Sequence, residues 1–200
     1  MSKKTRVFVA GTFAAVVSLA AAAAQAQVGT GPWTSYSPSF SVQERGCGDV
    51  ADLTFRLTCS TASGDQRAER RYATYTSGTR QFQGSFRISS MGGTRISLKQ
   101  TFRHESGAGF MLAVERGGRL YRVGGETIAS GATVGTTVRV NTVHSTSSGS
   151  HQCYINGSQR HSYTLAKNGA GYYDKLGSYR TSSGQGPITV VWSGIRFWRK

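Results

Sequence analysis

The stretch HQCYINGSQRHSYTL, residues 151–165, decides the fold class because it encodes a β-hairpin by itself. Short strand-like runs lie on both sides of Asn156-Gly157. Both of these residues tolerate the positive φ angles of a type I′ turn, so the pair joins two antiparallel strands. The same reasoning predicts a second hairpin at Gly117-Gly118. Two such hairpins indicate antiparallel β-structure.

Outward from these hairpins, runs of β-branched and aromatic residues recur between Gly, Ser and Asn, and no useful amphipathic helical stretch occurs. We expect eleven strands, at residues 52–59, 67–75, 80–89, 94–103, 108–114, 119–123, 136–144, 151–155, 158–165, 172–179 and 188–199. Many short strands without intervening helices are typical of an antiparallel β-sandwich. The predicted fold class is therefore all-β.

Residues 1–26 have the layout of a cleavable signal peptide. A basic start precedes an apolar run, and Ala24-Gln25-Ala26 is a small-x-small processing site. A membrane anchor is the alternative, but the run ends at a processing site and not at a basic cluster. We expect cleavage after Ala26, secretion to the extracellular space or periplasm, and no membrane partner afterwards.

The remaining chain is expected to form one domain. Residues 27–45 are rich in Gly, Ser, Thr and Pro and are predicted to be an irregular lead-in. Residues 46–200 are predicted to form the β-sandwich domain, which we expect to be a monomer.

The chain is strongly basic, with 24 Lys and Arg against 9 Asp and Glu, a net charge of +15. Three of the basic residues lie in the predicted signal peptide, so the mature chain keeps 21 against 9, a net charge of +12. Most of them are arginine, whose planar guanidinium suits a carboxylate or phosphate. Such a field attracts polyanions but identifies none, and a solvated basic surface is the alternative.

Cys47, Cys59 and Cys153 are the three cysteines. An oxidising destination favours one disulfide and leaves one thiol over. Cys47 with Cys59 is the local choice, while Cys153 stays open as a partner. No Cys or His spacing typical of zinc occurs, so no metal and no cofactor are expected.

Arg67, Glu69 and Arg71 lie two residues apart on an expected strand and so project from one face. Two guanidiniums that flank a carboxylate suit an acidic ligand, with Glu69 orienting the arginines. An ordinary charge ladder on a solvated face is the alternative.

Tyr173, Lys175, Gly177 and Tyr179 share a face in the same way. A glycine in a strand leaves room for a ligand to approach the backbone, and a tyrosine beside a cation can exchange a proton. The alternative is that both tyrosines are packing residues.

Gln100, Phe102 and His104 also alternate, but Ile96 and Leu98 fall on the same face and belong in a core. Either a bulge between the two sets switches their facing, or Gln100 is a buried, hydrogen-bonded amide. The sequence leaves both possibilities open.

The segments RAERR at 67–71, KQTF at 99–102 and YDKLGSY at 173–179 resemble, in this order, three motifs of family 7 polysaccharide lyases of the alginate-lyase type. Those motifs are RxExR, QxH and YxKxGxY, and the third is the most specific. The resemblance implies a jelly roll of the concanavalin A-like kind. It also implies β-elimination, in which Arg and Gln neutralise a uronate carboxylate, His or Tyr removes the C5 proton, and Tyr protonates the leaving oxygen. By position, the catalytic roles fall on Arg67, Arg71, Gln100 and Tyr179. The substrate-binding roles fall on Glu69, Lys175, Tyr173 and His104.

Phe102 stands where the family has its histidine, and phenylalanine carries no exchangeable proton. Tyr179 alone serves as base and acid if the C5 hydrogen and the leaving oxygen lie on the same side of the sugar, as in mannuronate or glucuronate. Alternatively His104 or His144 substitutes, or the domain has lost catalysis and only binds polyanions.

The sequence therefore favours a secreted lyase that cleaves an acidic polysaccharide without a cofactor. A non-catalytic module that binds such a polymer is the second hypothesis. A nucleic-acid binder is the third, but it rests on charge alone and no nucleic-acid motif occurs, so no nucleic acid partner is expected.

Overall fold

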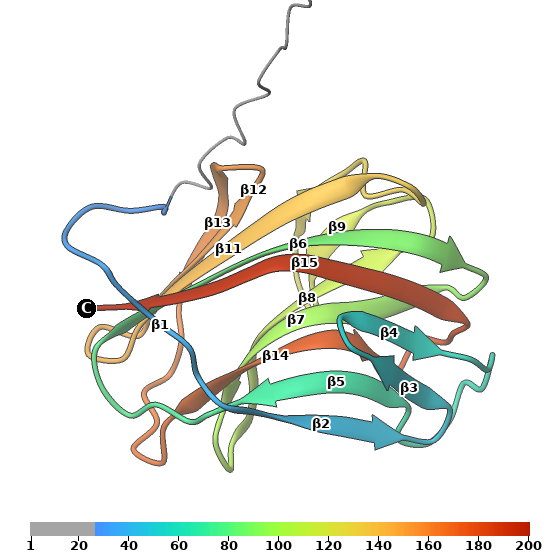
Figure 1. The fold of residues 1–200 in the computed structure, drawn as a ribbon, viewed down its shortest axis with the longest axis horizontal. Helices are drawn as coiled ribbons and strands as arrows, with labels where there is room; N and C mark the ends of the chain where they lie inside the picture. The colour runs from blue at the N-terminus through green and yellow to red at the C-terminus, as the bar shows by residue number, and fades with distance from the viewer. Residues whose placement is uncertain (1–26) are drawn as a thin grey trace, which may run out of the picture.

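The computed structural model describes residues 27–200, which form two antiparallel β-sheets packed face to face (Figure 1). This arrangement confirms the predicted all-β sandwich of the jelly-roll kind. The expected signal peptide, residues 1–26, lies outside the described residues. Within residues 27–200 no helix is long and apolar enough to cross a membrane.

One sheet has eight strands. They are β1 (Thr34–Tyr36), β3 (Gly48–Ala51), β4 (Thr54–Leu57), β6 (Thr79–Met91), β11 (Thr137–Ser145), β12 (Ser150–Ile155), β13 (Ser158–Thr164) and β15 (Ile188–Arg199). Their order is β13-β12-β11-β6-β15-β4-β3, and β1 pairs with β15 off this path. The first and last strands of the described residues therefore lie side by side, as Figure 1 shows for β1 and β15.

The other sheet has seven strands. They are β2 (Phe40–Arg45), β5 (Arg67–Tyr72), β7 (Arg95–Arg103), β8 (Gly107–Glu115), β9 (Leu120–Arg122), β10 (Thr127–Ala129) and β14 (Tyr172–Tyr179). Their order is β10-β9-β8-β7-β14-β5-β2. This order places β14 between β7 and β5, so the three segments with polar, alternating residues are direct neighbours.

Large apolar side chains from both sheets fill the space between them. Phe55, Phe82 and Trp192 of the eight-stranded sheet and Ile96 and Leu112 of the seven-stranded sheet are at most 1% exposed. Burial of each such side chain stabilises the fold by about 1.5–3 kcal/mol. The core therefore fixes which face of each strand is left for other contacts.

Both predicted hairpins are present. Asn156 and Gly157 have φ angles of 53° and 88° in the turn between β12 and β13. Gly117 and Gly118 have φ angles of 101° and 87° between β8 and β9. Positive φ at both central positions of the two-residue Asn156-Gly157 turn is the geometry of type I′. In the second hairpin the Gly118 N–H donates to the Glu115 carbonyl at 2.9 Å, so Arg116 and Gly117 are the central residues and the turn is not type I′.

The prediction that residues 27–45 are an irregular lead-in is wrong, because β1 and β2 lie there. β2 pairs with β5 along its whole length and forms the edge of the seven-stranded sheet. Its residues are mostly exposed, and the nearby Gly, Ser and Pro obscured a strand that nonlocal pairing holds in place. The strand expected at 52–59 is shorter, because Asp52, with a φ of 49°, and Leu53 form the turn between β3 and β4, and β4 ends at Leu57.

Cys47 and Cys59 form a disulfide with a Cα–Cα distance of 5.8 Å, which confirms the local choice. Cys153 is the free cysteine of residues 27–200, and it is fully buried. Burial raises the pKa of its thiol to about 12. The disulfide is consistent with an oxidising compartment.

Candidate functional site

A groove of about 350 Å³ lies on the face of the seven-stranded sheet that is turned away from the core. Strands β2, β5, β7, β8 and β14 all contribute to it. Its lining consists of Gln43, Arg67, Gln100, Phe102, Ala108, Met111, Tyr173, Lys175 and Tyr179. The groove therefore unites residues of all three segments that resemble the lyase motifs.

Strand β14 sends alternate side chains to the core and to the groove. Leu176 packs in the hydrophobic core, while Tyr173 and Lys175 line the groove. A register shift against β7 lies between Leu176 and Tyr179. Tyr179 lies an even number of residues after Tyr173 and Lys175, so regular alternation still places it in the groove and turns Ser178 inward.

Strand β7 contains the bulge that the sequence left open as one of two explanations. Its register shifts against β8 between Ser97 and Lys99. Ile96 and Leu98 consequently belong to the core, whereas Gln100 lines the groove. Gln100 is also a buried, hydrogen-bonded amide, so the two explanations hold together.

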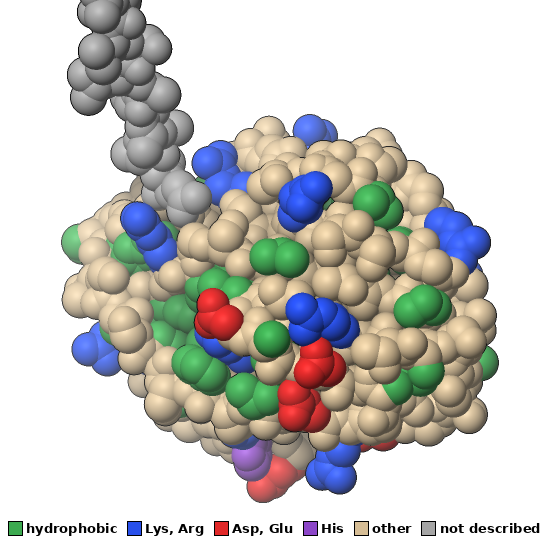
Figure 2. All heavy atoms as spheres, turned by 45° about the vertical axis from the view of Figure 1, so that its right-hand side comes forward, with side chains coloured by type: hydrophobic (Ala, Val, Ile, Leu, Met, Phe, Trp, Pro, Cys, Tyr) green, Lys and Arg blue, Asp and Glu red, His purple; other side chains and the backbone are tan. Residues whose placement is uncertain are grey.

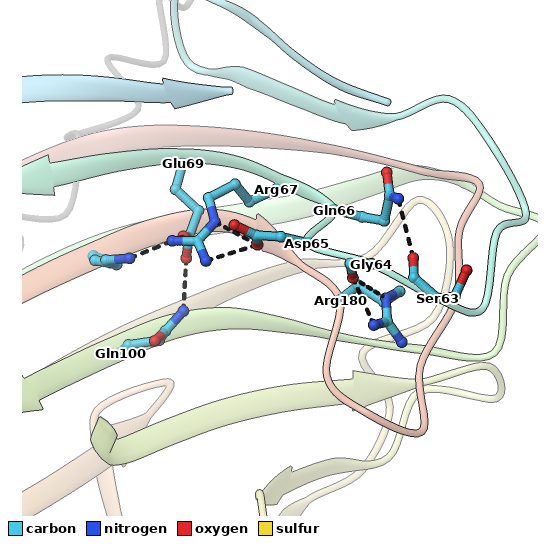
Figure 3. Close-up of polar contacts among 9 residues, drawn as sticks. Ser63, Gly64, Asp65, Gln66, Arg67, Glu69, Gln100 and Arg180 are labelled. Carbon is cyan, nitrogen blue, oxygen red and sulfur yellow. Dashed lines mark hydrogen bonds and ion pairs between the residues drawn. The ribbon is translucent and has the colours of Figure 1, made fainter. Parts of the chain in front are cut away.

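Glu69 is the centre of the polar contacts in the groove, as Figure 3 shows for its contact with Gln100. Its Oε1 accepts a hydrogen bond from Gln100 Nε2 at 2.6 Å. Its Oε2 accepts one from Lys175 Nζ at 3.3 Å and lies 3.8 Å from Arg67 Nη1. One buried carboxylate thereby orients an amide, an ammonium and a guanidinium.

Burial is the main cause of the pKa shifts in this cluster. Desolvation raises the pKa of Glu69, and the charges of Lys175 and Arg67 act against that rise. Desolvation lowers the pKa of Lys175, and the charge of Glu69 acts against that change. Burial of Glu69 and Lys175 therefore carries a desolvation cost, which the attraction between the two charges partly offsets.

The loop that precedes β5 holds Arg67 from the other side (Figure 3). Arg67 Nε donates to Asp65 Oδ1 at 2.8 Å. Arg180 Nη2 donates to the Gly64 carbonyl at 2.6 Å, and Gln66 Oε1 accepts from the backbone N–H of Cys47 at 2.7 Å. This loop and the disulfide thus fix the position of an arginine in the groove.

An aromatic platform forms one part of the groove. Phe102 and Tyr173 are stacked, with ring centroids 5.1 Å apart and an interplanar angle of 17°. Arg71 does not line the groove itself, but its Cζ lies 4.0 Å from the Tyr173 ring centroid. His104 lies edge-to-face with the Tyr173 ring, with the two ring centroids 6.0 Å apart, and it also lies outside the groove lining. Of the eight predicted site residues, five therefore line the groove, Glu69 is buried behind it, and Arg71 and His104 are peripheral.

The interpretation of Gly177 as room for a ligand is wrong. A Cβ atom at Gly177 would lie 2.2 Å from the Ala68 carbonyl oxygen and 2.8 Å from the Phe55 ring. The residue has a φ of 142°, which disfavours other side chains. Close approach of β5 and of the core, and not of a ligand, requires this glycine.

His144 cannot replace the missing histidine. It lies on β11 of the eight-stranded sheet, is 2% exposed, and its Nδ1 is 2.9 Å from the Tyr75 hydroxyl. The side chain is therefore enclosed in the sandwich, away from the groove on the seven-stranded sheet.

Sequence reasoning missed three residues of the groove: Gln43, Ala108 and Met111. Gln43 belongs to the predicted lead-in, although the alternation of Phe40 and Val42 with polar residues is a strand signal. Ala108 and Met111 straddle a register shift in β7–β8 pairing, which alternation does not reveal.

Among residues 27–200, no group of three or more His, Cys, Asp or Glu side chains could hold a metal ion. On the face shown in Figure 2, basic side chains are spread over the surface and acidic ones lie mostly beside them.

Comparison with known proteins places the fold. Neither a protein-family model nor a curated protein matches the chain. An alginate lyase from Corynebacterium sp. superposes with a TM-score of 0.61 and 17% identity over 76% of this chain and 81% of that one. A variant of a family 7 alginate lyase in complex with substrate superposes with a TM-score of 0.55 and 15% identity, over 74% of this chain and 77% of that one.

A sialidase also superposes, with a TM-score of 0.60 and 13% identity, but the match covers 79% of this chain and 16% of the sialidase. Because all these identities are low, the similarity establishes the fold and not the activity. The chain thus has the jelly-roll fold of alginate lyases, as its three motif-like segments suggested.

Proposed function

We propose that this chain is an exported lyase that cleaves an acidic, uronate-containing polysaccharide by β-elimination in the groove. The observation that carries the proposal is the convergence of Arg67, Gln100 and Tyr179 from three neighbouring strands on one groove. The alginate-lyase fold supports it independently.

Carboxylate neutralisation is the first task of such a site. Arg67 and Gln100 bind the carboxylate of the sugar, while Glu69 and Lys175 hold them in place. Withdrawal of negative charge from the carboxylate acidifies the neighbouring C5 hydrogen and stabilises the charge that develops there. Donors fixed in advance make this stabilisation large, because no reorganisation is needed during the reaction.

Tyr179 is the proposed proton carrier. As the phenolate it removes the C5 proton, a double bond forms between C4 and C5, the bond from C4 to the glycosidic oxygen breaks, and the Tyr179 hydroxyl gives the proton to that oxygen. The Arg67 Cζ lies 5.0 Å from the Tyr179 ring centroid, so the residue that binds the carboxylate lies beside the proton carrier.

Phe102 limits the sugar that can react. A single tyrosine serves as base and acid only when the C5 hydrogen and the leaving oxygen are on the same side of the ring. Mannuronate and glucuronate meet this condition, so polymannuronate or glucuronan is the proposed substrate. Phe102 stacks with Tyr173 and is only partly buried, so its ring offers an aromatic surface to the sugar.

The proposal includes export through the predicted signal peptide, action as a monomer, and no metal or cofactor. The Cys47–Cys59 disulfide supports an oxidising destination.

The test follows the ultraviolet absorbance of unsaturated uronates. Purified mature protein is incubated with polymannuronate, polyguluronate and glucuronan, beside Tyr179→Phe. We expect products from the first or third polymer, and a loss of about 10²–10⁴-fold in kcat in the variant with little change in binding. Product from polyguluronate alone would contradict the single-tyrosine mechanism.

A non-catalytic binding module is the second candidate, and Phe102 favours it because the family's histidine is absent. Absence of product from all three polymers, together with retention on an immobilised uronate polymer, would favour this candidate.

A further inference from the structure

A second hollow is lined by residues of the segment that links β1 to β2. Figure 1 shows this segment at the edge of the sandwich. It has a volume of about 470 Å³ and shares Tyr36 and Pro38 with an adjoining cavity of about 380 Å³. Together they form what we call the edge trough. Among the described residues, none lines both the edge trough and the groove.

The edge trough carries concentrated positive charge. Its lining includes Arg70, Arg80, Arg196 and Arg199, and none of the described lining residues is Asp or Glu. Arg196 and Arg199 are exposed. Arg70 is fixed by Asp52, whose backbone oxygen and Oδ1 accept from Arg70 Nη2 at 2.9 and 3.1 Å. An excess of guanidinium groups without carboxylates in the lining favours an anionic ligand.

Aromatic rings lie among these arginines. The Cζ of Arg199 lies 5.5 Å from the Tyr36 ring centroid, and the Cζ of Arg80 lies 5.9 Å from it. Arg70 lies 4.2 Å from the centroid of Phe40, a ring that is 48% exposed. A half-exposed ring next to a guanidinium can pack against the apolar face of a sugar while the guanidinium binds its carboxylate.

We propose that the edge trough is a second binding site for acidic polysaccharide, separate from the groove. This inference takes its sugar class from the proposed function. A polymer that occupies the groove and the edge trough together gains affinity by its second attachment, whereas an oligosaccharide too short to reach both gains none.

The test removes two exposed arginines and compares polymer with oligosaccharide. Arg196→Ser/Arg199→Ser is made in a Tyr179→Phe background, so that the polymer stays intact. Arg87→Ser/Arg160→Ser removes the same charge from exposed positions on the eight-stranded sheet and is the control. Calorimetry should show Kd for polymannuronate weakened about tenfold relative to the control, with Kd for a mannuronate tetrasaccharide unchanged. Equal polymer affinity in both double variants would overturn the inference.

A second variant tests the kind of ligand. Phe40→Ser should weaken polymannuronate binding and leave inorganic polyphosphate binding unchanged, because polyphosphate offers no sugar face. If the arginine variant weakens both polymers equally and Phe40→Ser affects neither, the edge trough is a general polyanion surface, nucleic acid included, and the saccharide assignment fails. Light scattering that shows loss of a dimer, without change in polymer binding, would assign the surface to a second copy of the chain and also overturn it.

These results are distinguishable from failure of the proposed lyase. If wild-type protein yields no unsaturated product and the arginine variant loses polymer affinity, the proposed lyase activity is refuted and polysaccharide binding by the edge trough is supported. If wild-type protein yields product and the arginine variant binds polymer as tightly as the control variant, the lyase activity is supported and binding by the edge trough is refuted.

Discussion

Lys99 and Asp174 form an ion pair inside the sandwich, directly behind the groove. Lys99 is 0% exposed, and its Nζ lies 2.5 Å from Asp174 Oδ1 and 4.8 Å from the Phe82 ring centroid of the opposite sheet. Asp174 also accepts from Thr101 Oγ1 at 3.1 Å. Removal of either charge therefore leaves the other charge buried with little compensation.

We predict that Lys99→Met, which keeps most of the volume, destabilises the fold strongly. At 2.5 Å the attraction is about 7 kcal/mol with an effective dielectric constant of about 20, and desolvation cancels part of it. Loss of one partner of a buried pair costs about 3–5 kcal/mol. For a domain of this size the corresponding fall in Tm is roughly 6–20 °C. Lys99→Met/Asp174→Leu, which removes both charges, should recover most of the loss.

Denaturant and thermal unfolding at pH 7, followed by circular dichroism, measure these changes. Lys167→Met is the control, because Lys167 is exposed and should tolerate the change within about 0.5 kcal/mol. The reasoning is refuted if Lys99→Met lowers the free energy of unfolding by less than about 1 kcal/mol. It is also refuted if the loss in the double variant equals the sum of the losses in Lys99→Met and Asp174→Leu measured alone.

Three further predictions concern protonation, the disulfide and the groove. Burial lowers the pKa of His144 to about 4 and the pKa of His151 well below 6.5. Both side chains therefore stay neutral in the folded protein below pH 6.5, whereas the same histidines bind protons in the unfolded chain. The free energy of unfolding should therefore fall by up to about 1.4 kcal/mol per pH unit for each histidine as the pH drops below 6.5. His144→Gln should reduce the slope of the free energy of unfolding against pH, and an unchanged slope would contradict the prediction. Cys47→Ser/Cys59→Ser should lose about 3 kcal/mol in urea unfolding, since the disulfide closes a loop between residues 12 apart, and a loss below about 1 kcal/mol would argue against that constraint. Phe102→His places a proton acceptor in the groove and should create or raise polyguluronate cleavage about tenfold or more, measured by ultraviolet absorbance, whereas no gain would show that this position alone does not supply the missing base.

Local sequence patterns predicted most of the fold. The hairpin turn at Asn156-Gly157 follows from backbone preferences of the two residues themselves, and it forms as predicted. Alternation within β5 and β14 likewise placed Arg67 with Glu69, and Tyr173 with Lys175, because side chains two apart on a strand share a face in any sheet.

Pairing between distant strands decided the rest. The bulge at Ser97–Lys99 turns Gln100 toward the groove, and it exists only because β7 pairs with β8. The edge strand β2 needs β5 beside it, so its own exposed residues carried too weak a signal.

The sequence by itself therefore determined the fold class, the hairpin turns and the residues that share a strand face, since each depends on local backbone geometry. The tertiary structure alone decided that His144 is enclosed, that Lys99 meets Asp174, and that four arginines gather in the edge trough. Each of these depends on which distant strands pair and which sheets pack, and a local pattern carries no record of that choice.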